Sequence, residues 1–129
     1  MFRTGIFMSV AATLLLSVSA VDAQQLSGNV IIDVCNEDPN GGNCLGFIVG
    51  TIDGMRWAAD VAAMRSGATE AQAMRNLAET LLGACTPPTS TGGQLSAVAL
   101  KYMQNHPENW HEPAVVLIHR ALMEAFPCR

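Results

Sequence analysis

Histidines and paired carboxylates are the side chains in this sequence that could most readily bind a metal or transfer a proton. The three histidines, His106, His111 and His119, fall within one short stretch. No two of them lie four residues apart on one expected helix, and the zinc motif H-E-x-x-H does not occur. We therefore expect His106 to be a helix C-cap, His111 a turn residue and His119 a surface residue. We expect no metal and no other cofactor.

Asp53 and Asp60 would lie near each other on a long helix and could imitate a catalytic carboxylate pair. Solvated charges on a helix surface explain them better. The sequence contains no G-x-S-x-G, no phosphate-binding loop and no G-x-G-x-x-G. We expect no catalytic residues, and hence a protein that is not an enzyme.

The N-terminus has the three parts of a cleavable secretory signal. Arg3 precedes an apolar run from Ile6 to Val18, and Val21-Asp22-Ala23 supplies the small residues of a cleavage site. We expect residues 1–23 to be removed, with cleavage after Ala20 as the alternative. The apolar run is shorter than the ~20 residues that a spanning helix needs, so the pattern predicts export and not a membrane anchor.

The remaining residues, 24–129, have the length of one domain. The formal net charge of the chain is −4, and the predicted signal removes one cation and one anion, which leaves that balance unchanged. Nucleic acids and anionic membranes require clustered cations, so we expect neither as a partner. The balance fits a soluble domain with a basic partner.

The four cysteines, Cys35, Cys44, Cys85 and Cys128, all follow the predicted signal. An even number in an exported chain indicates disulfides, and no C-x-x-C or C-x-x-C-H suggests redox chemistry or covalent haem. Three pairings can be drawn, and the sequence alone does not choose among them. Position favours Cys35–Cys44, which closes a turn at residues 38–42, and Cys85–Cys128, which ties the last residues to the middle.

Apolar residues recur at helical spacing in five segments. Thr69 with Gln72 and Thr91 with Gln94 form capping-box patterns at two of the starts. The first segment, behind a Ser27 cap, would also suit a strand, but we favour a helix. The expected helices cover about residues 27–37, 44–65, 69–85, 91–106 and 113–126. The sequence predicts an all-α domain, a small bundle of about five helices stapled by two disulfides.

The apolar sides of these helices predict the core. In the third helix they include Leu81 beside Met74, Leu77 and Leu82, and in the last helix they include Ala125 beside Leu117, Ile118, Ala121 and Leu122.

Gly46, Gly50 and Gly54 recur every four residues and form one bare stripe on the second helix. Glycine costs roughly 1 kcal/mol against alanine inside a helix, so the stripe predicts a neighbour that packs too close for side chains. We favour a neighbour within the chain, and a second subunit in a homodimer is the alternative. Trp57 and Trp110 are expected to pack in the core, although either could anchor an interface.

Short motifs along residues 44–128 together resemble one family. Residues 44–54 are similar to the C-x-G-[YF]-I-x-G-x-x-D-G segment of the Rap/Tai immunity proteins. Cys85-Thr86-Pro87 resembles the family's C-x-P, residues 91–95 its T-x-G-Q-L, and residues 102–108 its Y-L-x-x-H-P-E. The ending resembles the closing helix of the family through His111, Pro113-Ala114, Ala121-Leu122 and residues 125–128. Residues 65–84 match none of these motifs.

The resemblance implies a periplasmic helical protein, often dimeric, that protects a bacterium by occluding the active site of a type VI secreted peptidoglycan amidase. The same resemblance supports the favoured cysteine pairs. The alternative is a periplasmic structural or adaptor domain of the same fold with another protein partner. The residues that would contact the partner are not indicated by the sequence.

Overall fold

The computed structural model describes residues 26–129, so the predicted signal and its cleavage site lie outside the described residues. The five expected helices are all present, as α1 (Gly28–Glu37), α2 (Gly42–Arg65), α3 (Ala71–Leu82), α4 (Gly92–Asn105) and α5 (Ala114–Ala125). A short 3-10 turn, Pro107–Asn109, follows α4. The all-α prediction with two disulfides is confirmed. No helix in the described part of the chain has the length and apolar character to cross a bilayer.

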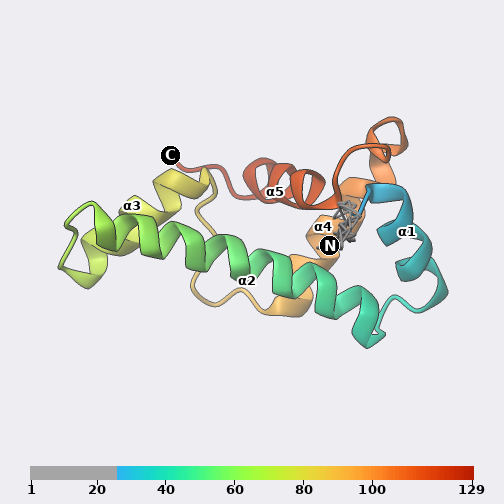
Figure 1. Ribbon diagram of the computed structural model, residues 1–129, viewed down its shortest axis with the longest axis horizontal. Helices are drawn as coiled ribbons and strands as arrows, with labels where there is room; N and C mark the ends of the chain where they lie inside the picture. The colour runs from blue at the N-terminus through green and yellow to red at the C-terminus, as the bar shows by residue number, and fades with distance from the viewer. Residues whose placement is uncertain (1–25) are drawn as a thin grey trace, which may run out of the picture.

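The long helix α2 runs along most of the molecule and supports the other four (Figure 1). Its first half packs with α1, α4 and α5 around the main core, and its second half forms an antiparallel hairpin with α3. The largest fully buried apolar side chains are those of Ile32, Ile48, Ile52, Leu95, Met103, Leu117, Ile118 and Leu122. A smaller cluster of Ala59, Ala63 and Ala78, with Met74, Leu77 and Leu82, joins α2 to α3. Small residues let these two helices approach closely.

The start of α1 is held by the segment before α5. Gly28 N–H donates to Glu112 O at 2.9 Å and Asn29 N–H donates to Trp110 O at 2.9 Å. These carbonyls satisfy amides that a side-chain cap would otherwise bind, and Ser27 occupies the N-cap position without a side-chain hydrogen bond. A Cβ on Gly28 would lie 2.5 Å from Leu117 Cδ1, so glycine permits this close approach.

The two predicted capping boxes have different outcomes. At α4, Gln94 N–H donates to Thr91 Oγ1 at 3.2 Å and Thr91 N–H donates to Gln94 Oε1 at 2.9 Å, so this prediction is confirmed. At α3 the prediction is wrong. The helix begins at Ala71 with Glu70 as its N-cap, and Gln72 donates to Asn76 Oδ1 instead.

Two side chains predicted to face inward are exposed. Leu81 is 54% exposed because α3 packs mainly against α2, which covers only part of its apolar side. Ala125 is exposed at the last position of α5. The remaining apolar residues predicted for α5 are all buried.

The segment between α4 and α5 is fixed by two side-chain contacts. Trp110 Nε1–H donates to Met103 O at 2.6 Å, which makes this half-buried tryptophan part of the structure around the core, as expected. Arg120 pairs with Glu112 at 2.8 Å. The hydrogen bond from Arg120, together with its charge, holds the pKa of the Glu112 carboxyl below its ordinary value.

Candidate functional site

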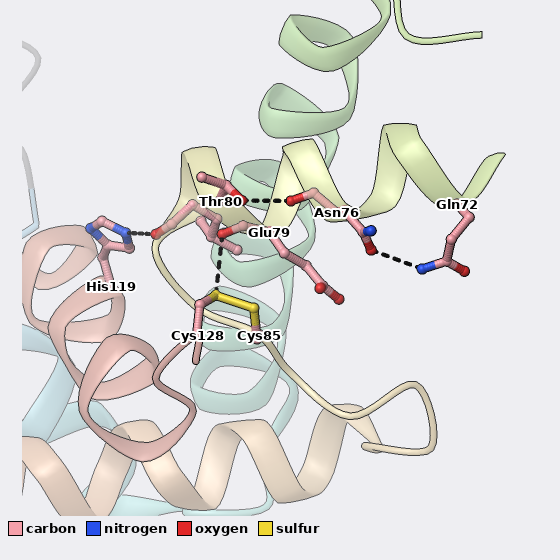
Figure 2. Close-up of a disulfide and its surroundings, with 8 residues drawn as sticks. Gln72, Asn76, Glu79, Thr80, Cys85, His119 and Cys128 are labelled. Carbon is pink, nitrogen blue, oxygen red and sulfur yellow. Dashed lines mark hydrogen bonds between the residues drawn. A yellow bond between two sulfur atoms is a disulfide. The ribbon is translucent and has the colours of Figure 1, made fainter. Parts of the chain in front are cut away.

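The cysteines are used structurally. Cys35 pairs with Cys44 and Cys85 with Cys128, each with Cα atoms 5.0 Å apart, which confirms the favoured pairing. The first bridge is buried in the core between α1 and α2. The second joins the end of the chain to the residues after α3 (Figure 2). The described residues therefore contain no free thiol.

Two of the three histidines bind backbone carbonyls. His106 Nδ1 lies 2.8 Å from Tyr102 O, and its ring stacks on that of Tyr102. His119 Nε2 lies 2.6 Å from Leu82 O, where it links α5 to the end of α3 (Figure 2). His111 is exposed in the turn before α5. The structure thus places the three side chains in separate surroundings, and His106 is the C-cap of α4 as predicted.

Asp53 and Asp60 do not share a site. Asp53 is exposed and borders a small depression of about 160 Å³ beside Gly92 and Leu95. Asp60 is half-buried and borders a different, larger depression between α2 and α3.

The glycine stripe is not covered by the chain. A Cβ added to Gly46, Gly50 or Gly54 would meet no atom of the described residues within 4 Å. The expectation of a close neighbour within the chain is therefore wrong for this part of the molecule, and the alternative of a second subunit stays a prediction. Trp57, expected in the core, lies along the same face of α2 and is 65% exposed. Helical periodicity alone placed these residues on one face but could not show that the face is uncovered.

Because no atom crowds the stripe, we expect Gly50→Ala to stabilise the isolated domain by roughly 0.5–1 kcal/mol. The gain comes from the lower backbone entropy of the unfolded chain. Thermal or urea unfolding of the dilute protein would measure it. Gly28→Ala is the matched comparison, since its Cβ would clash with Leu117, and it should destabilise the domain. A Gly50→Ala variant that unfolds more easily in dilute solution would contradict the prediction.

A depression of about 340 Å³ lies between α2, α3 and the connection that follows α3. We call it the α2–α3 hollow. Its charged lining consists of Arg56 and Asp60 from α2 and Arg75 and Glu79 from α3. The apolar and hydroxyl lining is formed by Ala59, Ala78, Leu82, Ala84, Thr86, Pro87, Pro88 and Ser90. The hollow therefore combines both signs of charge with small apolar and hydroxyl side chains.

One wall of the hollow is fixed by a hydrogen bond over a long sequence separation. Arg56 Nη2 donates to Thr86 Oγ1 at 2.5 Å, and Thr86 is buried. This bond ties the Pro87-Pro88 wall to α2. The next residue before Thr86 is Cys85, whose disulfide anchors the same connection to the end of the chain.

Sequence reasoning did not identify this hollow. The available signal was an arginine followed four residues later by a carboxylate, once on α2 as Arg56 and Asp60 and once on α3 as Arg75 and Glu79. That spacing usually indicates solvated helix pairs, and only the packing of the helices shows that both pairs face one depression. Arg75 and Glu79 belong to the segment 65–84 that matched no motif.

The chain is a small helical domain cross-linked by two disulfides. Its cysteines and two of its histidines make structural contacts. Its surface presents the α2–α3 hollow and an uncovered face of α2. The model of a known family, described as Rap1a immunity proteins, matches residues 27–128. The chain belongs to this family, as the motifs indicated, which makes it an immunity protein with another protein as its partner. No curated protein and no solved structure matches the chain significantly.

Proposed function

We propose that this immunity protein is exported to the periplasm and inhibits a peptidoglycan amidase delivered by type VI secretion. The observation that carries the proposal is the family match over nearly all of the described residues. Inhibition would be stoichiometric, because the protein would block the cleft of the amidase by binding and would not act as an enzyme.

The structure supports a role in binding through its stiffness. Two disulfides fix the ends of the domain, and the connection after α3 is held by Arg56 and by Cys85. A surface that is ordered before association loses less conformational entropy when it binds. Export would supply the oxidising environment in which both bridges form.

The decisive experiment starts from residues 24–129, oxidised and purified, used as bait against periplasmic extracts of the source cell and of its competitors. A captured amidase is then purified and mixed with the protein at increasing ratios, while release of peptidoglycan peptides is measured. We expect complete inhibition at a one-to-one ratio. Full amidase activity at a large excess of the protein would overturn the proposal, and recovery of only resident envelope proteins would favour an adaptor role.

Export is tested separately by cell fractionation and by the intact mass of the periplasmic form. We expect the mass of a chain that begins at Gln24. A full-length chain in the cytoplasm would contradict the periplasmic assignment.

A further inference from the structure

We propose that the Cys85–Cys128 bridge is a thiol–disulfide exchange site, which a dithiol reductant opens in the folded domain by attack on Cys128 Sγ, while the Cys35–Cys44 bridge stays closed. One bridge is then permanent and the other reversible. The inference goes beyond amidase inhibition and does not depend on it, because it concerns the chemistry of this chain alone.

The two bridges differ in how easily a thiolate can reach their sulfur atoms. Cys35 is 4% exposed and Cys44 is 0% exposed, and both belong to the main core. Cys128 is exposed and Cys85 is half-buried, and their bridge lies beside the end of α3 (Figure 2). Disulfide exchange requires a thiolate to reach a sulfur atom, and exposed bridges are the labile ones. A reductant therefore reaches the second bridge in the folded protein, and reaches the first only after the core has opened.

The surroundings of the second bridge favour attack on the sulfur of Cys128. This residue is the more exposed of the two, and its Sγ lies 3.7 Å from Glu79 O, one of the last four carbonyl oxygens of α3 (Figure 2). Carbonyl oxygens and the negative end of a helix dipole disfavour a thiolate at this place. Cys85 is therefore the better leaving thiolate, and the reductant bonds to Cys128. Once released, Cys128 can remain a thiol that donates its S–H to Glu79 O.

The exchange transfers two electrons from the dithiol to the bridge. The first thiolate of the dithiol bonds to Cys128 Sγ as the Sγ–Sγ bond breaks, and Cys85 leaves as a thiolate that takes a proton from water. The second thiol of the dithiol, after losing its proton to water, attacks the reductant's own sulfur and releases Cys128, which is protonated in turn. The bridge becomes two thiols and the dithiol becomes a disulfide, so no further reactant is needed.

Contacts that do not involve sulfur hold the chain end in place after the bridge opens. Cys85 N–H donates to Phe126 O at 2.8 Å, and Phe126 is half-buried against the main core. The next residue after Cys85 is Thr86, which is held by Arg56. The two thiols consequently remain near each other, so the opening is local and an oxidant can close the bridge again. Reduction loosens the connection after α3, which forms one wall of the α2–α3 hollow, without unfolding the core.

The first test treats the oxidised protein with dithiothreitol in native buffer, stops samples with iodoacetamide and locates the alkylated cysteines by peptide mass spectrometry. We expect Cys85 and Cys128 to be alkylated at least about 100-fold faster than Cys35 and Cys44, with unchanged helical circular dichroism. The control is the same reaction in urea above the unfolding midpoint, where both bridges should be reduced at similar rates. Equal rates in native buffer, or loss of helicity together with the first reduction, would overturn the proposal.

The second test identifies the sulfur that is attacked. Reduced glutathione, a monothiol, replaces dithiothreitol, and the mixed disulfide is trapped with acid and mapped by mass spectrometry. We expect glutathione mainly on Cys128. Glutathione mainly on Cys85, or on the cysteines of the buried bridge, would show that this assignment is wrong.

The third test uses the variant Cys85→Ser/Cys128→Ser to determine whether the domain stays folded without this bridge. We expect its Cys35–Cys44 bridge to resist dithiothreitol in native buffer. Amide hydrogen exchange should become faster mainly at residues 84–90 and 126–129. Reduction of the remaining bridge as fast as in urea, or exchange that becomes equally fast in α1 and α2, would mean global unfolding and would contradict a local opening. None of the three tests uses an amidase, so a failure of the proposed function leaves their outcomes unaffected.

Discussion

A variant in which Cys85 and Cys128 are both serine is expected to unfold with a free energy about 4 kcal/mol below that of the wild type. The bridge closes a loop with a sequence separation of 43 residues, and the chain-entropy relation gives this value for a loop of that length. Cys128 is exposed and Cys85 is half-buried, so serine leaves no deeply buried hydroxyl that would add a second cause. Such a loss is a large share of the stability of a domain of this size.

Urea unfolding followed by circular dichroism, without reductant, measures the effect. His111→Ala is the control, since His111 is exposed and its loss should change stability by no more than about 0.5 kcal/mol. Equal unfolding midpoints for the cysteine variant and the histidine variant would contradict the prediction. The buried Cys35–Cys44 pair is a poorer test, because serine there would also bury unpaired hydroxyls.

Replacement of Ile48 by alanine is expected to lower the free energy of unfolding by about 3 kcal/mol, within the roughly 2–5 kcal/mol seen for isoleucine and leucine truncations in cores. Ile48 is 0% exposed, next to the buried Cys35–Cys44 bridge in the main core. The surrounding helices are held by that bridge and can collapse into the cavity only in part, so most of the lost contact energy should be observed.

The control for this prediction is Trp57→Ala on the opposite face of α2. Trp57 is the larger side chain, yet it is 65% exposed, and its removal should change stability by about 0.5 kcal/mol or less. Unfolding should again be followed by circular dichroism, because the control removes a tryptophan fluorophore. A Trp57 variant less stable than the Ile48 variant would show that the exposed face of α2 is covered in solution.

The helices could be predicted from the sequence because each one buries a stripe of apolar residues at helical spacing. Their exact starts depended on tertiary contacts. Thr69 and Thr91 carry the same capping pattern, but α3 begins only at Ala71, after a turn in which Gly67 has φ +90. Ser27 does not cap α1 because backbone carbonyls from residues 110 and 112 already bind the first amides.

The candidate site was harder to predict than the fold. The hollow exists because α2 and α3 pack through Ala59, Ala63 and Ala78, and no local pattern reports the register of two helices across a turn. The glycine stripe was equally hard to interpret. Its spacing predicted that the three glycines share one face of α2, but it could not predict whether another part of the chain covers that face. The disulfide pairing was favoured correctly, because position along the chain and the family pattern agreed.

The order of the bridges along the chain has a consequence for biogenesis. Each cysteine is joined to the next one in sequence, Cys35 to Cys44 and then Cys85 to Cys128. A chain that crosses a membrane N-terminus first would present the cysteines to an oxidant in that same order. Joining each newly arrived thiol to the one before it yields the native pairs, and the slow reshuffling of wrong disulfides is avoided. If the chain is exported as proposed, we therefore expect it to reach its native pairs with an oxidase alone, without a disulfide isomerase.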